Sequence, residues 1–507
     1  MNTTKTIIII AVLSLFAMIS CSTARMVNSN ESIRSQVSPC NPSDELKIYE
    51  LSMIWKEAEY NFAFWEKLEG TLDWEQAYKE ALPRVLATNS LFEYYLELSK
   101  FVALLRDGHT GVWFPDSIWE DENLTAGLTV AFDLINDQYI IDMVDESVID
   151  IVKPGSIVHK INGVDIEEFI ETNIYPYIWH EKKDSAFYLM QDFLRRWSMN
   201  NEALFEIEYE GKIETITLQR TVYPKNWISL YKDVIQTEEL RVVYESDTHI
   251  IAFAEDNIAV ITINTMGNDD LPADFFANYP LLENAAGYII DVRNNGGGNS
   301  GNGDAVSAVF IGEDFINHRM LLRIHMGTYK AWGSFQDFGD LSWEQIVENA
   351  IEEYGEEMIN EPEALQWIER SYKISGKKYF EDSISFINVS DLNMPGVLNA
   401  PLVVLSSSGT ASAAEDFLIA LDTAKRATIV GTASYGSTGQ PLMLHLESGG
   451  TVRICTIWSI YPDGREFINI GVQPHIEIEN TIEDMKNGVD AVMNKGLEEV
   501  RRQIREK

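Results

Sequence analysis

Ser412 lies in a stretch that could present a nucleophile. Residues 401–405 are an apolar run of strand-forming residues, and apolar residues recur at helical spacing from Ala411 onward. A strand, a tight turn and a helix would place Ser412 in the first helical turn, beside unpaired N–H groups that stabilise a developing negative charge. Because serines before a helix usually serve as caps or turn residues, this stretch by itself does not establish a nucleophile.

His109 has a setting suited to a general base. Gly108 and Gly111 bracket His109 and Thr110, and Asp107 comes just before them. Such a tight turn could hold an imidazole in one position for proton transfer. A lone histidine is more often structural, but no other histidine of the chain has a comparable setting.

A glycine-rich segment could supply an oxyanion hole. Residues 287–292 are an apolar run of the buried-strand type that leads into Gly296, Gly297 and Gly298. Glycines at the end of a strand let the backbone approach a ligand, and successive free N–H groups can bind an oxyanion. A phosphate-binding loop is the weaker interpretation, because the Gly-x-x-x-x-Gly-Lys spacing is missing.

The elements that must position these residues indicate an α/β fold. Residues 258–263 and 287–292 are expected to be strands separated by a helical segment, which is the pattern of a crossover unit in a sheet. Residues 44–114 show helical spacing rich in aromatic residues, which we interpret as core and not as a ligand site.

Residues 125–221 change to short strand-like runs. The segment from Gly155 to Gly163 resembles the Gly-Asp-x-Ile-x-x-Ile-Asn-Gly segment of PDZ domains, with Ser156 in place of the aspartate. Such modules bind an extended peptide as an added strand, and Gly127 and Leu128 are the expected substrate-binding residues. The alternative is that the module only packs against its neighbours.

Length, charge and the N-terminus limit the classes of function. At 507 residues the chain should hold several domains, and its net charge of −40 argues against a nucleic-acid partner. The first 20 residues have the pattern of an export signal, and a small residue before Cys21 resembles a bacterial lipobox. We therefore expect a lipoprotein of the cell envelope, periplasmic or outer-membrane associated, anchored to the membrane through lipidated Cys21. A simple cleaved signal is the alternative.

Several motifs in order resemble the S41 serine peptidases, a family that includes the tail-specific peptidases and the tricorn core. They are the run from Asp291 through Gly298, the segment from Gly409 to Glu415, residues 431–436, and the late segment from Asp463 to Pro474. This resemblance implies a crotonase- or ClpP-like α/β peptidase core.

The resemblance also implies roles for individual residues. Ser412 matches the nucleophile, and Gly297, Gly298 and Ala413 would form the oxyanion hole. Ser437 stands where tail-specific members carry a lysine base, so the resemblance favours the branch in which a histidine, here His109, is the base. The acidic partner is expected to be Glu466, with Asp463 behind it.

The expected function is hydrolysis of peptide bonds in extended or unfolded polypeptides, without a metal or organic cofactor. The alternatives are a non-catalytic lipoprotein that binds a peptide or an apolar ligand on the same fold, and an acyl hydrolase. The predicted divisions are a signal peptide at 1–20, a lipidated tether at 21–43, a helical domain at 44–114, a PDZ-like module at 125–221, a peptidase core at 239–480 with a helical insertion at 319–387, and a C-terminal helix at 481–507.

Overall fold

The computed structural model describes residues 41–121, 124, 126–197, 202–221, 226–230, 240–323, 341–355, 379–382 and 386–506. The predicted signal peptide, Cys21 and nearly all of the predicted tether lie outside these residues. Within them, the structure contains no helix whose length and apolar character would suit it to crossing a membrane.

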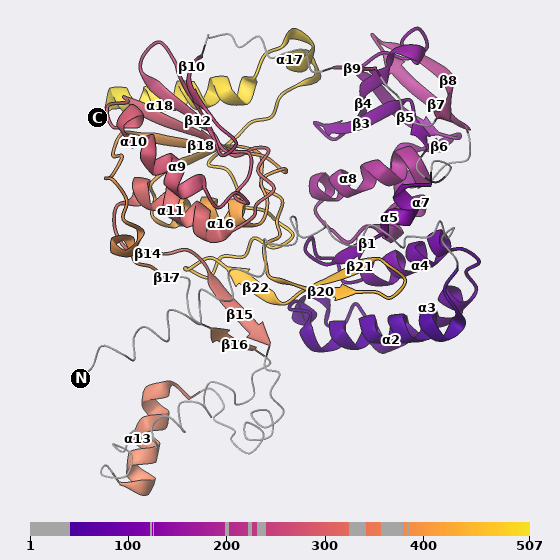
Figure 1. The fold of residues 1–507 in the computed structure, drawn as a ribbon, viewed down its shortest axis with the longest axis horizontal. Coiled ribbons are helices and arrows are strands. Elements are labelled where there is room, and N and C mark those ends of the chain that lie inside the picture. The colour runs from indigo at the N-terminus through magenta and orange to yellow at the C-terminus, as the bar shows by residue number, and fades with distance from the viewer. Residues whose placement is uncertain are drawn as a thin grey trace, which may run out of the picture. The chain divides into compact units, whose positions relative to one another are not determined.

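Among the described residues, seven strands form a central sheet: β10 (Arg241–Glu245), β11 (Ile250–Phe253), β12 (Ile258–Thr262), β13 (Gly287–Asp291), β18 (Leu402–Ser406), β19 (Thr428–Gly431) and β23 (Ile476–Glu477). They lie side by side in this order, as Figure 1 shows for β10, β12 and β18. The strands from β12 to β23 are parallel, whereas β10 and β11 extend the sheet in antiparallel fashion. The two strands expected at 258–263 and 287–292 are β12 and β13.

Helices cover both faces of this sheet (Figure 1). They are α9 (Leu271–Ala277), α10 (Tyr279–Leu282), α11 (Ser300–Ile311), α16 (Ala413–Thr423) and α18 (Ala491–Glu506). The short helix α17 (Ile482–Asn487) instead packs through Met485 with Ile135, Ile140 and Leu230. Because neighbouring residues of a strand point to opposite faces, Ile290 and Val404 pack with α9, α11 and α16, whereas Ile289 and Val403 pack with α18. Parallel strands buried on both faces are therefore continuous apolar runs, as the sequence shows.

The N-terminal part of the described chain is helical. Its elements are α2 (Asp44–Asn61), η2 (Trp65–Leu68), α3 (Trp74–Leu86), α4 (Leu91–Ala103), β1 (Gly111–Trp113) and α5 (Asp116–Trp119). Side chains of Ser43, Asp73 and Ser90 accept hydrogen bonds from the first turns of α2, α3 and α4 and so fix where these helices begin.

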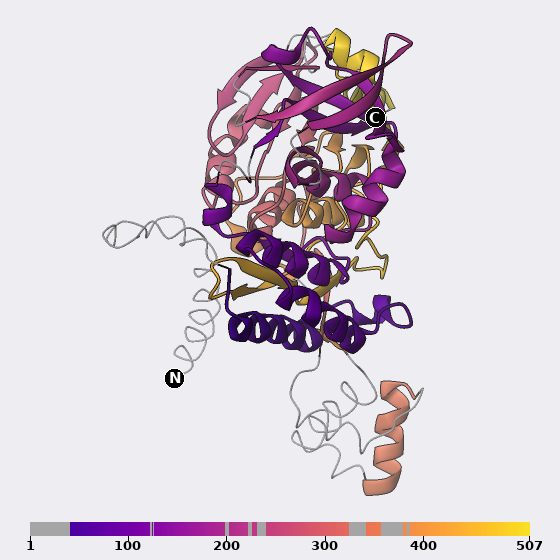
Figure 2. The same ribbon diagram turned by 90° about the vertical axis from the view of Figure 1, so that its right-hand side faces the viewer.

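A hairpin from late in the sequence completes this helical part. β20 (Pro441–His445) pairs with β21 (Thr451–Cys455), and β21 also pairs with β1. In Figure 2 the hairpin, in gold, lies among the indigo helices. The pairing brings the turn that follows α4 to the edge of a sheet formed by residues some 340 positions later, since Gly111 lies opposite Arg453.

A β-rich module, residues 127–229, follows the helical part. Its strands are β2 (Gly127–Leu128), β3 (Val130–Ile135), β4 (Gln138–Asp145), β5 (Ser156–Ile161), β6 (Val164–Asp165), β7 (Glu202–Tyr209), β8 (Lys212–Thr221) and β9 (Trp227–Ser229). Its helical elements are η3 (Glu146–Val148), α7 (Ile166–Asn173), η4 (Tyr175–Tyr177), α8 (Lys183–Asp192) and η5 (Phe193–Trp197). The module has its own apolar core, which includes Phe132 and Phe205.

The predicted helical insertion at 319–387 is only partly helical in its described residues. It contains β15 (Arg319–Arg323), α13 (Trp343–Tyr354), β16 (Tyr379–Asp382) and β17 (Phe386–Ile387). β15 pairs with both β16 and β22 (Ile457–Ile460), and β17 pairs with β14 (Phe315–Ile316). A short η6 (Val389–Leu392) comes before β18. The sequence predicted helix here from its many Trp, Tyr and Glu residues. The strands were not predicted, because the strands with which they pair are distant in sequence.

Candidate active site

Ser412 is held at the entrance to α16, directly beyond the edge of the central sheet where β18 ends. Its φ is 55° and its ψ is −125°, a backbone conformation that residues with a side chain rarely adopt. Its N–H lies 3.2 Å from the carbonyl oxygen of Ser437 and 3.2 Å from Oε2 of Glu415. This strained turn holds the backbone that carries the hydroxyl in one conformation, as a positioned nucleophile requires.

His109 faces the hydroxyl of Ser412. Its Nε2 lies 3.1 Å from Ser412 Oγ, although the two residues are 303 positions apart in the chain. The turn that carries His109 is tied to Asp107, whose Oδ2 accepts hydrogen bonds from the His109 N–H at 3.1 Å and from Thr110 Oγ1 at 2.7 Å. The structure therefore brings together the two residues that the sequence predicted as nucleophile and base.

Ser437 connects the other side of the imidazole to Asp107. The Ser437 Oγ lies 2.6 Å from His109 Nδ1 and donates to Asp107 Oδ1 at 3.1 Å. Because this hydroxyl donates to the carboxylate, it is free to accept the Nδ1–H of the imidazole. That tautomer leaves Nε2 as the acceptor for the Ser412 proton.

Burial largely determines the protonation states of His109 and Asp107. Burial, together with the charge of Arg453, lowers the pKa of His109 to about 4, so the imidazole is neutral at pH 7. Burial raises the pKa of Asp107 to about 6, against hydrogen bonds from Thr110, Ser437 and His109 that favour the carboxylate. At neutral pH the site therefore holds a neutral base and an ionised acidic partner.

Glu415 ties the loop that carries Ser437 to the nucleophile turn. Its carboxylate accepts hydrogen bonds from Ser434 Oγ, from the N–H groups of Gly436 and Ser437, and from the N–H of Ser412. Burial raises the pKa of Glu415 to about 8, whereas these four donors oppose the shift by stabilising the ionised form. Glu415 is thus a buried anchor that does not face the nucleophile hydroxyl.

The glycine-rich segment lies against the nucleophile turn. A Cβ added to Gly297 would lie 2.6 Å from the Cβ of Ser412 and 2.9 Å from the nitrogen of Ala413. The N–H of Gly297 donates to Asn295 Oδ1 at 3.0 Å, which removes it from the predicted oxyanion hole. In the part of the chain that the structure describes, the N–H groups of Gly298 and Ala413 have no acceptor, and they remain as the candidate donors.

The structure does not bring Glu466 to His109, where we expected the acidic partner. Oε2 of Glu466 accepts hydrogen bonds from Lys67 Nζ at 3.2 Å and from Trp458 Nε1 at 3.1 Å, and its side chain is exposed. Asp463, the second choice, pairs with Arg465. Both follow β22, a strand of a small sheet, and this places them apart from the turn that holds His109.

The remaining predicted site residues lie elsewhere. Gly127 and Leu128 form β2, an edge strand opposite Thr221 and Arg220 of β8, and Leu128 is buried in the core of the β-rich module. No bond joins either residue to Ser412 or His109 among the described contacts. Their role in binding a peptide stays a prediction, and Cys21 lies outside the described residues.

Asp107 and Ser437 were not predicted to be functional residues. The carboxylate was visible two residues before His109, in a turn bracketed by glycines. Ser437 was identified only as the residue at the position of a lysine in tail-specific peptidases. Nothing in its local sequence pattern shows that its hydroxyl contacts an imidazole 328 positions away.

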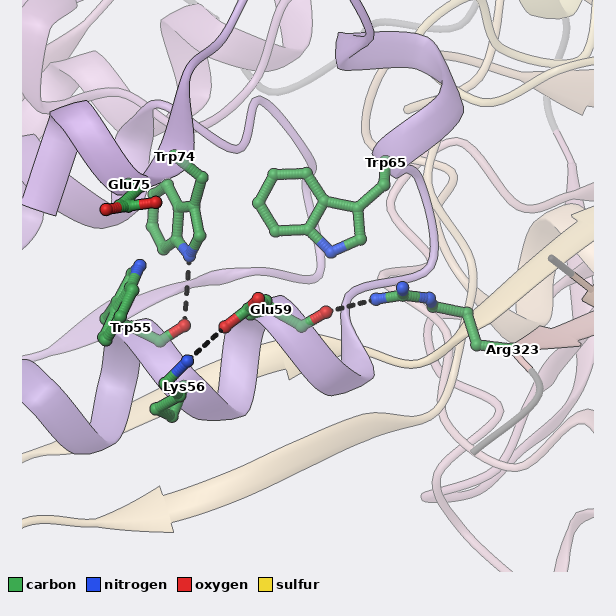
Figure 3. A pocket seen from close by; sticks show the side chains of 7 residues that line it. All are labelled: Trp55, Lys56, Glu59, Trp65, Trp74, Glu75 and Arg323. Carbon is green, nitrogen blue, oxygen red and sulfur yellow. Dashed lines mark hydrogen bonds and ion pairs between the residues drawn. The ribbon is translucent and has the colours of Figure 1, made fainter. Parts of the chain in front are cut away.

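A separate pocket of about 400 Å³ lies on the helical part (Figure 3). It is lined by Trp55, Lys56, Glu59, Trp65, Trp74, Glu75 and Arg323. Trp74 is buried core, as expected of aromatic residues at helical spacing, but Trp55 and Trp65 remain partly exposed toward the pocket. None of its residues belongs to the site around Ser412. Over the described residues, no group of three or more His, Cys, Asp or Glu side chains could hold a metal ion.

Comparisons with known proteins found a family model that matches part of the chain and a curated relative that matches a shorter part. Residues 257–478 match the family model described as Peptidase family S41. Over 107 residues the chain is 34% identical to a carboxy-terminal-processing protease of Bartonella bacilliformis, a match that covers 21% of this chain and 24% of that protein. The match therefore spans only about a quarter of the length of this curated relative.

Solved structures show the same fold at low sequence identity. The structure of mature CPAF has a TM-score of 0.64 at 15% identity and covers 92% of this chain and 98% of its own. Mature CPAF complexed with lactacystin has a TM-score of 0.62 at 15% identity, with 92% and 99% covered. The expected α/β fold is confirmed.

Proposed function

We propose that this chain, a member of peptidase family S41 through residues 257–478, is a serine peptidase that hydrolyses peptide bonds of extended or unfolded polypeptides. The observation that carries the proposal is the approach of His109 Nε2 to Ser412 Oγ, at 3.1 Å, with the imidazole held from behind by Ser437 and Asp107. A nucleophile, a base and an orienting acid in hydrogen-bonded sequence are the parts that acyl transfer needs.

The reaction would proceed through an acyl-enzyme. Ser412 Oγ attacks the carbonyl carbon of the scissile bond while His109 Nε2 accepts the hydroxyl proton. His109 then gives this proton to the leaving amine, and the peptide C–N bond breaks. Water, deprotonated by the same imidazole, attacks the ester and releases the acid, which restores Ser412.

Asp107 and Ser437 would support the imidazole throughout the cycle. The ionised Asp107 favours the positive charge that His109 gains in each transition state, and it acts through the Ser437 hydroxyl between them. The N–H groups of Gly298 and Ala413 would bind the oxyanion, each contributing about 3 kcal/mol to the transition state.

The experiment that tests the proposal is hydrolysis of an unfolded polypeptide by the purified full-length chain. Reduced and alkylated casein should be cut by the unmodified chain and by Ser408→Ala, a matched serine of the same turn, but not by Ser412→Ala or His109→Ala. Cleavage that survives Ser412→Ala would overturn the proposal. Rapid turnover of small esters without cleavage of casein would instead support the acyl hydrolase, and no turnover of either would support the binding protein.

The N-terminal pattern supports a second part of the proposal, that the peptidase is a lipoprotein of the bacterial cell envelope. Cys21 would carry the lipid, and residues 22–43 would form the tether. Metabolic labelling with an alkyne fatty acid should label the chain and its Cys40→Ser variant but not Cys21→Ser. Labelling of Cys21→Ser would contradict the anchor.

A further inference from the structure

Arg453 is a partly buried cation without an anionic partner in the described part of the chain. Its Nε is buried and has no hydrogen-bond acceptor, and burial lowers the pKa of the guanidinium. Two other arginines of the same part of the chain have acceptors: Arg293 binds Asp291 and Asp490. Arg426 donates to the backbone carbonyls of Phe310, Leu398 and Ala400. In a chain with 79 acidic and 39 basic residues, an arginine left unpaired indicates that its partner is supplied from outside.

The place of Arg453 ties it to the proposed catalytic base. It lies on β21 opposite Gly111 of β1, and Gly111 follows His109 by two residues. The positive charge of Arg453 adds to the effect of burial in lowering the pKa of His109.

The surroundings of Arg453 form a platform that could hold a polypeptide. Because side chains alternate along strands, Arg453 shares one sheet face with Trp113 of β1 and Met443 of β20. The guanidinium lies 4.1 Å from the centre of the Trp113 ring. Trp113 is 36% exposed and Met443 is 41% exposed. Trp179 packs beside Trp113 with 5.8 Å between ring centres. We call Trp113, Met443 and Arg453 the Arg453 face.

The reaction geometry assigns this face to one side of the scissile bond. His109 must deliver its proton to the leaving amine, so the leaving part of the substrate departs on the side of Ser412 where His109 stands. The strand that continues from the His109 turn is β1, whose Trp113 belongs to the Arg453 face. A polypeptide leaving past His109 would therefore pass over the exposed ring of Trp113 and the guanidinium.

We propose that the Arg453 face binds a carboxylate on the leaving-group side of the scissile bond, so that the enzyme prefers substrates with an acid there. A guanidinium fixed on an aromatic ring presents its N–H fork to a planar carboxylate, which neutral or basic groups cannot match. The carboxylate can come from an Asp or Glu side chain or from the carboxy terminus of the substrate. This inference rests on the proposed peptidase function.

The test compares matched peptides built around a bond that the chain cuts in unfolded casein. Each peptide carries Glu, Gln or Lys at one of the first three positions after that bond, once with an amidated and once with a free carboxy terminus. With the unmodified chain we expect kcat/KM for the best Glu position, or for the free terminus, to exceed that of its neutral counterpart by roughly 10-fold.

Variants of Arg453 then identify the source of the preference. Arg453→Gln should bring the ratio of acidic to neutral substrate to about 1, and Arg453→Glu should favour Lys, as expected when a charge-assisted contact is removed or reversed. The ratio is measured within one variant, so a partial loss of folded protein does not affect it. Arg465→Gln, which removes an exposed arginine paired with Asp463 and Asp422, is the matched control and should keep the preference.

The outcomes separate this inference from the proposed function. Cleavage without a preference for acid, or a preference that survives Arg453→Gln, overturns the inference and leaves the peptidase intact. If no peptide is cut, the proposed function fails; binding of the same peptides to the Ser412→Ala chain then still tests the face. The inference is supported if the Ser412→Ala chain binds the acidic peptide more tightly than the neutral one and the double variant Ser412→Ala/Arg453→Gln does not. Equal binding of the two peptides to the Ser412→Ala chain overturns the inference.

Discussion

His109 is neutral near pH 7 because desolvation in its half-buried position and the charge of Arg453 lower its pKa to about 4, while Asp107 is ionised only above its raised pKa of about 6. The hydroxyl of Ser437 lies between these two groups and forms a hydrogen bond with each of them. The low pKa of His109 keeps it available as a base, and the ionised Asp107 compensates by stabilising the imidazolium that forms during the reaction.

The dependence of kcat/KM on pH should report this arrangement. Activity requires both groups unprotonated, so it should rise with pH through an apparent pKa near 6, set by Asp107, and fall as the pH drops below that value. In Asp107→Asn the remaining acidic limb should move to lower pH, because only His109, with a pKa of about 4, still titrates there, and kcat should fall. An acidic limb that does not move would show that Asp107 is not the group observed.

Ser437→Ala should separate the base from its acidic partner. The imidazole would lose its Nδ1 contact, and we expect kcat to fall by about 10- to 100-fold with little change in KM, as for loss of a group that orients a catalytic residue. Steady-state kinetics on casein-derived peptides measures both quantities. An unchanged kcat would place Ser437 outside the mechanism.

The sequence predicted the nucleophile and the base but not the residues behind the base. Ser412 and His109 stand out because their local patterns are unusual, a serine before a helix and a histidine between glycines. Glu466 was chosen by its distance along the chain from a motif, and the fold instead gives its carboxylate to Lys67 and Trp458. Contacts that depend on packing between distant elements have no local signature.

At the scale of elements, the glycine-rich segment and the turn before α16 depend on each other. Gly297 has a φ of 95°, and its Cα approaches Ser412 so closely that no side chain fits between them. The strand–helix–strand pattern predicted β12 and β13 because apolar periodicity is local. The described strands of residues 319–387 were not predicted, because their partners are far away in the sequence.

Gly297→Ala should abolish activity while the fold persists. The added Cβ would displace Ser412 or Ala413, and a shift of about 1 Å at a nucleophile can lower kcat by about 100-fold or more. Gly296→Ala is the matched control, because a Cβ there would meet no atom within 4 Å. Peptide hydrolysis, with circular dichroism to follow folding, measures the effect; equal activity in the two variants would contradict this view of the turn.

At the scale of the whole molecule, the catalytic groups are supplied by regions that are remote in sequence. The β-rich module also reaches the loop that carries Ser437: Ser185 Oγ donates to the carbonyl oxygen of Tyr435 at 2.7 Å, and the His180 ring lies 4.5 Å from the Tyr435 ring. The position of His109 therefore depends on the helical part, on the loops that follow the strands of the central sheet, and on the β-rich module.

Arg293 joins the central sheet to the C-terminal helix and should contribute strongly to stability. Its guanidinium binds Asp291 at the end of β13 and Asp490 just before α18, at 2.7 and 2.8 Å. Arg293→Met would leave two largely buried carboxylates without a partner, and we expect a loss of about 3–5 kcal/mol in the free energy of unfolding. Arg501→Met breaks a more exposed pair with Asp256 and should cost less than about 1 kcal/mol. Urea unfolding distinguishes them, and equal losses would contradict the assignment.

The most direct test of the central claim is reaction of the purified full-length chain with a fluorophosphonate, which labels serines activated by a neighbouring base, followed by mass spectrometry of the labelled peptide. We predict a single label on Ser412, lost in Ser412→Ala and strongly reduced in His109→Ala. A label on another serine, or labelling of Ser412 that is unchanged in His109→Ala, would contradict the claim that His109 activates Ser412.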